Sequence, residues 1–305
     1  MRAYVAGRLA TAVLVILGVS VVSFFLTFLT GDPAEIMLPP GATAAQIEKF
    51  RAEWGFADPL PVQYWRFLTR AVHGDFGISL RHGQSSLPLI VARLPATLQL
   101  TGTAMLLAIV LAVPLGVLAA SRRGGPIDFL AMSVALLGQS VPNFWLVIMM
   151  ILLFAVSWGL LPTSGRGGFA HVVMPAAAIA INLMALLTRL VRSTMIEILS
   201  EDYVRTARAK GLREVLVTGR HALPNALIPL VTVVGLQFGY ILGGAVVIET
   251  IFTWPGVGLF TIQAILNRDY PVVQAAVVIL ATAVVLINLA VDLLYVWLDP
   301  RIRVT

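Results

Sequence analysis

Long hydrophobic runs alternate with short polar segments along this chain. Six runs hold about 20 residues or more with few charges, and as helices they can cross a hydrocarbon core of roughly 30 Å. Only helices and closed barrels satisfy all backbone polar groups in lipid, and continuous runs lack the alternation of barrel strands. We therefore predict an all-α polytopic membrane protein. The predicted spans are residues 9–29, 96–120, 128–157, 172–195, 226–251 and 272–297.

Composition and charge agree with this class. Hydrophobic residues make up 59% of the chain and charged residues 12%, so the bilayer is its main solvent. The absence of cysteine excludes disulfides and thiolate metal sites. The net charge of +6 does not indicate a nucleic-acid partner, because the basic residues flank the apolar runs. The first run is too long for a signal-peptide core, and no cleavage pattern follows it, so it is predicted to be a span.

The placement of Lys and Arg predicts the orientation. Short cytoplasmic segments of membrane proteins carry an excess of these residues. With the N-terminus inside, most of the basic residues fall on the cytoplasmic side, and an even number of spans returns the C-terminus to that side. The basic residues predicted inside are Arg2, Arg8, Arg122, Arg123, the cluster in 189–221, Arg301 and Arg303.

The outer segment, residues 30–95, contains two amphipathic stretches. Thr43 and Gln46 form a capping-box pattern before the first, and Asp58-Pro59 precedes the second. We expect these helices to lie on the outer face, either at the lipid headgroups or against a partner protein. The alternative is that they pack on their own subunit as a small lid. The apolar positions are Ile47, Phe50 and Trp54 in the first stretch, and Leu60, Tyr64, Phe67, Leu68 and Ala71 in the second.

Polar residues and proline interrupt the third run. Gln139, Pro142 and Asn143 stand in its middle, and proline removes a backbone donor there. Polar groups at membrane depth need protein or water as partners. The interruption predicts a kink, which either borders a cavity or serves packing alone.

Glycines repeat at four-residue spacing in the fifth run, at Gly235, Gly239 and Gly243, with Gly244 following. Such a stripe permits close helix packing, or it lines a wide pathway for a large solute. In the second case Gln237 supplies a polar contact. The candidate pathway residues are Asn143, Gln237, Gly239 and Gly243.

Several kinds of chemistry are missing from the sequence. No G-x-x-x-x-G-K-[ST] occurs, so P-loop ATP hydrolysis by this chain is excluded. All four histidines lie outside the predicted spans, which argues against an intramembrane protease or a metal site. Glu249, Asn288 and Asp292 do not form a central ion relay. For Asn288 and Asp292 we expect hydrogen bonds between helices, with a transport role as the alternative.

The basic loop from Glu201 to Pro224 reads EDYVRTARAKGLREVLVTGRHALP. Glu201 and Asp202 suit a helix N-terminus, and Gly211 ends that helix. A second stretch, about 212–221, precedes Leu223-Pro224, where proline is expected to stop it before the next span. The result is a short helix–turn–helix outside the membrane, joined to two spans. It either transmits force from a soluble partner or is an ordinary solvated basic loop.

This loop resembles the cytoplasmic loop of permeases in bacterial ABC importers, whose pattern is E-A-A-x-x-x-G followed further on by I-x-L-P. Ala207, Gly211, Leu223 and Pro224 match that pattern. Arg205, Thr206 and His221 depart from it in a way that is similar to the dipeptide, oligopeptide and glutathione (peptide/nickel) subfamily. Further similar segments are Gly31-Asp32-Pro33, Gly74–Gly77, Gly159–Thr163, Gly235–Gly244, Trp254–Gly256 and Arg268–Pro271.

The resemblance implies a type I ABC importer permease with six transmembrane helices in the bacterial inner membrane. Relatives of this kind pair with a second homologous permease, two ABC ATPase subunits and an extracytoplasmic substrate-binding protein. The ATPase subunits use ATP and Mg, and the permease binds no cofactor. Residues 1–95 would form the first span and outer segment, and 96–305 a five-helix core with a coupling loop at 196–225.

The resemblance also implies residue roles. Residues 202–216 would form the coupling helix, with Ala207 allowing close approach, Gly211 making the turn, and Leu223 and Pro224 anchoring the loop. Alternatives are a permease for a nickel chelate or another small solute and, in a different class, a stand-alone channel or ion-coupled carrier. The implied ATPase-coupling residues are Asp202, Tyr203, Arg205, Ala207, Lys210, Gly211, Leu223 and Pro224.

Overall fold

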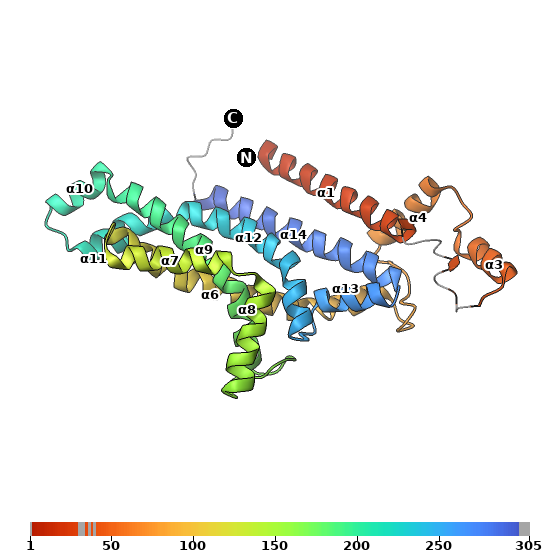
Figure 1. Cartoon of the computed structure of the whole chain (residues 1–305). Helices are drawn as coiled ribbons and strands as arrows, with labels where there is room; N and C mark the ends of the chain where they lie inside the picture. Colours follow the sequence, from red (N-terminus) through yellow and green to blue (C-terminus); the bar gives the residue numbers. More distant parts are fainter. Residues whose placement is uncertain (1, 30–33, 36–37, 39–40, 299–305) are drawn as a thin grey trace. The chain divides into compact units, whose positions relative to one another are not determined.

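The computed structural model describes residues 2–29, 34–35, 38 and 41–298, and within them it contains helices but no strand. Figure 1 shows long helices joined by short connections. The predicted Gly31-Asp32-Pro33 motif and the inner Arg301 and Arg303 lie outside the described residues. The long helices are α1 (Arg2–Leu29), α6 (Leu94–Ser121), α9 (Phe169–Leu199), α12 (Leu223–Ile251) and α14 (Tyr270–Leu298).

The third predicted span is a bent pair of helices. α7 (Pro126–Ser140) and α8 (Asn143–Met150), which continues as the π-helix η1 (Ile151–Ser157), meet at an angle of 101°. Pro142 stands at the break, where it donates no backbone hydrogen bond and disfavours helical geometry in Val141. In the described residues, five single helices are long and apolar enough to span a membrane, and the bent pair makes six. The predicted all-α fold and the predicted kink are confirmed.

The chain divides into two compact units. The first comprises Met1–Thr97 with Pro255–Leu286, and the second Leu98–Trp254 with Ile287–Thr305. α6 and α14 each begin in the first unit and continue into the second. The shorter helices of the first unit are α3 (Ala44–Trp54), α4 (Leu60–Val72), α5 (Ser86–Val91) and α13 (Val257–Leu266).

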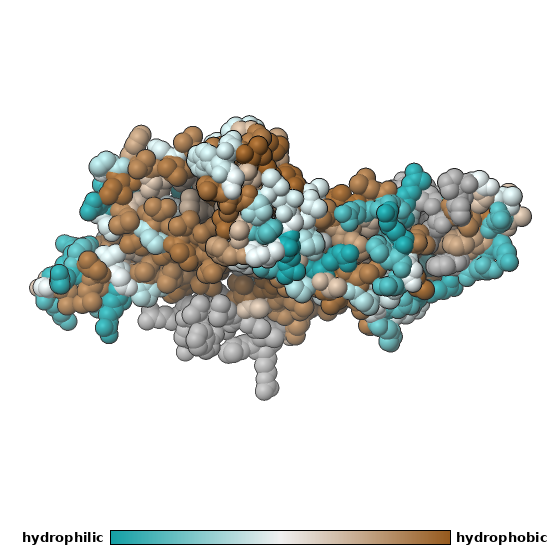
Figure 2. Space-filling view, turned by 90° about the horizontal axis from the view of Figure 1, so that it is seen from below, coloured by the Kyte–Doolittle hydropathy of each residue, from teal (hydrophilic) through white to brown (hydrophobic). Residues whose placement is uncertain are grey.

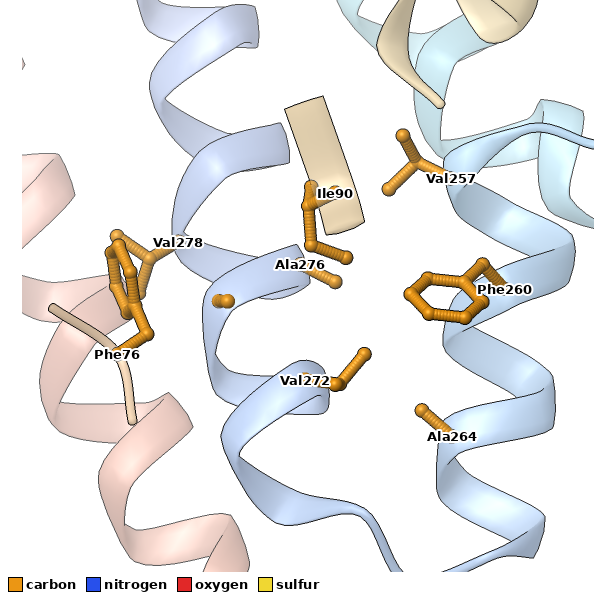
Figure 3. Packing of buried hydrophobic residues seen from close by; sticks show 9 residues of the cluster. Phe76, Ile90, Val257, Phe260, Ala264, Val272, Ala276 and Val278 are labelled. Carbon is orange, nitrogen blue, oxygen red and sulfur yellow. The ribbon is translucent and has the colours of Figure 1, made fainter. Parts of the chain in front are cut away.

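The core of the first unit joins segments that are far apart in the sequence. Figure 3 shows Phe76 of the outer segment beside Val278 of α14, and Ile90 between α14 and Val257 of α13. Nearby, the buried Asp269 carboxylate accepts hydrogen bonds from the Ser79 hydroxyl and, at 3.2 Å, from the Leu80 amide. The motifs at 74–77 and 268–271 are therefore parts of one packed structure.

The outer helices follow the predicted signals. Thr43 and Gln46 form the complete capping box of α3, and Pro59 precedes α4. α4 packs on α1 of its own unit, where the Tyr64 hydroxyl lies 2.9 Å from that of Ser20. This contact favours the own-subunit alternative for α4. Leu60 is an exception on the predicted apolar face, because it is exposed.

The second unit is built around α9, which packs against α7 and α12 and buries side chains along most of its length. α6 and α7 expose large apolar side chains, such as Leu106 and Phe129, as lipid-facing helices do. Figure 2 shows broad hydrophobic areas on the face in view, with hydrophilic residues in separate patches.

Candidate functional site

The first candidate site is the basic loop after α9. The helix α10 (Asp202–Ala209) begins three residues beyond Leu199, with Glu201 as its N-cap. Figure 1 shows it at the end of α9. Val204 and Ala207 are buried on one face of α10, where they form a small core with Val217. The helix predicted to end at Gly211 is confirmed, but the implied single helix over 202–216 is wrong, because residues 210–213 form a turn before the short α11 (Glu214–Leu216). The small side chain of Ala207 lies inside the loop's own core.

A glycine and an ion pair hold the turn after α10. Gly211 has φ +76°, which L-residues with a side chain rarely adopt, and no atom in the described part of the chain lies within 4 Å of the place of a Cβ. Arg208 donates two hydrogen bonds to the Glu214 carboxylate, at 2.7 and 3.0 Å, and a third to the Leu199 carbonyl at 3.2 Å. The hydrogen bond to Glu214 raises the pKa of Arg208. The loop is therefore a defined shape rather than an open connection.

The predicted stop at Pro224 is wrong. The short α11 (Glu214–Leu216) and the π-helix η2 (Val217–Ala222) run directly into α12 at Leu223. Pro224 stands in the first turn of α12, where a missing backbone donor costs little, and it follows the wider turns of η2. The Asn225 amide donates to the Tyr203 hydroxyl at 2.8 Å and ties α10 to this helix.

Charged side chains cover the outer face of α10. Asp202, Arg205 and Lys210 are exposed, and Tyr203 is 43% exposed. Asp202 and Arg205 lie 3.6 Å apart with side chains 98% and 74% exposed, so their pairing adds little stability. Among the described residues, Tyr203 is the member of this set that also bonds to α12, through Asn225.

An ion pair that the sequence analysis missed links α7 to α9. The Arg192 guanidinium donates two hydrogen bonds to the Asp128 carboxylate, one of them at 2.7 Å, and the Gly124 amide donates a third at 2.9 Å. Asp128 is buried. The available signal in the sequence was Asp128, a lone acidic residue at the start of an apolar run. The sequence does not indicate which basic residue pairs with it. The pair fixes α7 to the helix that leads into α10.

The second candidate site is a cavity of about 180 Å³ in the second unit. It lies where the break between α7 and α8 meets the middle of α9 and of α12. Its polar lining is Gln139, Asn143, Asn182, Gln237 and Tyr240, with Gly244 beside them. The Asn182 amide donates a hydrogen bond to the Asn143 side-chain oxygen.

This cavity brings together part of the predicted pathway set. Asn143 and Gln237 line it, whereas Gly239 and Gly243 do not. Asn182 and Tyr240 were missed; a single Asn in the middle of an apolar run was the signal for the first. The kink at Pro142 borders a cavity, which is the functional alternative of the two expectations.

The glycine stripe on α12 serves two purposes. A Cβ on Gly235 would lie 2.1 Å from the Val291 Cγ1 of α14, so this glycine permits close packing. No atom of the described residues lies within 4 Å of the corresponding position on Gly243 or Gly244, and Gly244 lines the cavity. The packing explanation therefore applies to the beginning of the stripe and not to its end.

Two other polar residues of the spans are Asn288 and Glu249. The Oδ1 atom of Asn288 is buried without a hydrogen-bond partner among the described residues, so the expected interhelical bond is not seen at that atom. Glu249 is completely buried. Across the described residues, no group of three or more His, Cys, Asp or Glu side chains is placed to hold a metal ion.

Comparison with solved structures identifies the fold. An inward-facing structure of the MetNI methionine ABC transporter matches with a TM-score of 0.60 at 22% identity, covering 69% of this chain and 96% of that chain. An amino acid ABC transporter crystallised with histidines matches with a TM-score of 0.51 at 19% identity, covering 70% and 94%. The fold is that of the membrane subunit of an ABC importer.

Sequence comparison identifies the family. The family described as "Binding-protein-dependent transport system inner membrane component" matches residues 112–304, and its N-terminal companion family, "Binding-prot-dependent transport system membrane comp, N-term", matches 1–101. The chain belongs to this family of transport subunits, as its loop indicated, and is not an enzyme.

Two curated relatives match from end to end. The glutathione transport system permease protein GsiC of Escherichia coli (strain K12) is 40% identical over 304 residues, covering 99% of both chains. The dipeptide transport system permease protein DppB of the same strain is 40% identical over 339 residues, again covering 99% of both. The resemblance drawn from the sequence is thereby confirmed.

Proposed function

We propose that this chain forms half of the translocation pathway of an ATP-driven importer for short peptides or peptide-like solutes. The observation that carries the proposal is the shape of the loop after α9. α10 presents a charged outer face, while its inner face is packed against the ends of two spans. The end-to-end similarity to a glutathione and a dipeptide permease supports peptides as the solute class.

In this proposal α10 is the contact for a separate ATPase subunit. Asp202, Arg205 and Lys210 would meet the ATPase from the exposed face, and Tyr203 would do so while bonded to α12 through Asn225. Because η2 continues into α12, a push on α10 reaches the fifth span through one helix. Leu223 and Pro224 lie at this junction, and Ala207 and Gly211 keep the loop compact.

The complete transporter would contain a second homologous permease, two ABC ATPase subunits that use ATP and Mg, and an extracytoplasmic substrate-binding protein. This chain would lie in the bacterial inner membrane with both termini cytoplasmic. Residues 1–95 would supply the first span and outer segment, and 96–305 the core with the coupling loop 196–225. The boundary between the two matched families, near residue 100, supports this division.

The solute would pass along the face of α12 and the break between α7 and α8. Asn143 and Gln237 line the cavity there, and Gly243 leaves open space on the same helix. Gly239, which stands between Gln237 and Gly243 in the sequence, is assigned to the pathway as well.

The function is tested by the ATPase activity of the co-purified complex in lipid, with and without binding protein loaded with a mixed dipeptide pool. We expect the loaded binding protein to stimulate hydrolysis and to support uptake. Uptake without nucleotide, by a chain that purifies with no ATPase, would instead place the protein among channels or carriers.

The coupling assignment is tested by Gly211→Trp. The large side chain should stand between α10 and the ATPase, so hydrolysis should continue at its basal rate while uptake is lost. Gly124→Trp is the matched control, because Gly124 has nearly the same φ, +75°, and equally open surroundings. Both variants strain the backbone by roughly 1–2 kcal/mol. Normal uptake by the Gly211→Trp complex would disprove the assignment.

A further inference from the structure

Polar side chains surround the cavity of the second unit, at the break between α7 and α8 and near the middle of α9 and α12. Gln139, Asn143 and Tyr240 are exposed, Tyr240 by 77%, and Asn182 and Gln237 are half-buried near the midpoints of α9 and α12. Unsatisfied polar groups in hydrocarbon cost several kcal/mol each. This face therefore does not meet lipid tails. It meets water, a solute or a second polar protein surface.

The chemistry of the cavity is uniform. Four of its polar side chains are carboxamides and the fifth is a phenol, and no charged residue lines it. A carboxamide offers N–H donors and a carbonyl acceptor, the same groups that a peptide bond offers. Such a lining can exchange hydrogen bonds with a peptide backbone but cannot neutralise a charged side chain.

The volume of the cavity is that of one half of a solute-binding site. The cavity of about 180 Å³ is smaller than the roughly 300–1,000 Å³ of pockets that enclose small molecules. In the proposed transporter, a second permease would supply the opposite wall.

The hydrogen bond between the side chains of Asn182 and Asn143 can be replaced by a hydrogen bond to a solute. When no solute is present, this bond partners one N–H of Asn182 and the side-chain oxygen of Asn143, which lowers the cost of leaving those two groups without a solute. A peptide bond can replace either partner, since it donates and accepts in the same way. Binding is then weak enough for release, as a transport pathway requires.

We propose that Gln139, Asn143, Asn182 and Gln237 form a neutral station that hydrogen-bonds the peptide backbone of the solute halfway across the membrane. These four side chains bind the peptide backbone and do not select among solutes by side-chain charge. This inference rests on the proposed function as a peptide importer.

The test introduces a charge into the station of the complete transporter. Gln237→Glu keeps the size of the side chain and replaces its amide by a carboxylate. Uptake of Lys-Ala, Ala-Ala and Asp-Ala is measured in proteoliposomes with loaded binding protein, together with stimulated ATPase activity. Gln139→Glu repeats the test at an exposed position of the same cavity. Gln263→Glu is the matched control, because Gln263 lies on α13 outside the cavity lining.

We expect Gln237→Glu to raise the uptake ratio of Lys-Ala to Asp-Ala roughly tenfold, because a desolvated carboxylate attracts the lysyl peptide and repels the acidic one. The Gln263→Glu complex should keep both the wild-type uptake ratio and the wild-type stimulation of ATPase activity. An unchanged ratio in active Gln237→Glu and Gln139→Glu complexes would overturn the station and leave the importer assignment intact. Failure of the wild-type complex to take up any of the three dipeptides would overturn the proposed function itself.

Discussion

The ion pair between Asp128 and Arg192 makes a quantitative prediction. It joins the first turn of α7 to α9 about two turns before α9 ends. Asp128→Asn keeps the shape of the side chain and removes its charge, which leaves the Arg192 guanidinium without a counter-ion. We expect the folded chain to lose stability and the connection between α7 and the loop-bearing helix to loosen.

The magnitude follows from the burial of the two side chains. Removing one partner of a fully buried pair costs roughly 3–5 kcal/mol. The Asp128 side chain is 6% exposed but the Arg192 side chain is 26% exposed, so water can partly hydrate the orphaned cation. We therefore expect a loss of about 2–3 kcal/mol, or roughly 30–150-fold in the folding equilibrium.

The assay is the free energy of unfolding of the purified chain in mild detergent, titrated with a denaturing detergent. Glu53→Gln is the control, because its pair with Lys49 spans 3.8 Å between side chains that are 58% and 77% exposed; its cost should stay below about 0.5 kcal/mol. Adding Arg192→Gln to Asp128→Asn should cost little more, since it removes the uncompensated charge. A loss no larger than that of the control would refute the reasoning.

Two further predictions concern packing and pH. Gly235→Ala places a methyl group against Val291 and should cost about 1–3 kcal/mol of unfolding free energy; Val291→Ala should restore it, and Gly243→Ala, in open space, should cost little. In the outer segment, the hydrogen bond from Arg70 lowers the pKa of Asp75, so this carboxylate stabilises the fold above its unfolded pKa of about 3.9 and loses that effect as pH falls through its lower folded value. The thermal stability of wild type should therefore drop more than that of Asp75→Asn below about pH 4, and parallel pH curves would contradict this.

Local patterns in the sequence were sufficient for the secondary structure. Each predicted span depends only on a continuous apolar run, and each appears as a helix or, at 128–157, as a bent pair. The capping box at Thr43 and the turn at Gly211 likewise depend on neighbouring residues alone. The loop motif was enough to indicate the family, because several matching segments occur in the same order.

At Pro224 the local pattern gave a wrong expectation. Pro224 was expected to interrupt the chain, because proline disrupts a regular α-helix. The π-helical turns before it, and the Asn225 amide that donates to the His221 carbonyl at 3.3 Å, accommodate it instead. A change in helix type leaves no clear mark in the sequence.

The candidate sites depend on partners that are distant along the chain, and only the tertiary structure decided these. Asp128 forms an ion pair with Arg192, and Asn143 accepts a hydrogen bond from Asn182, because the break after α7 and the packing of α9 bring these side chains together. In the glycine stripe, Gly235 packs against Val291, while among the described residues no atom lies within 4 Å of a Cβ placed on Gly243. The apolar pattern of a span indicates that a helix is buried in lipid or protein. It does not indicate which face of the helix contacts lipid and which contacts a neighbouring helix. That choice follows from packing between helices, which no local pattern encodes.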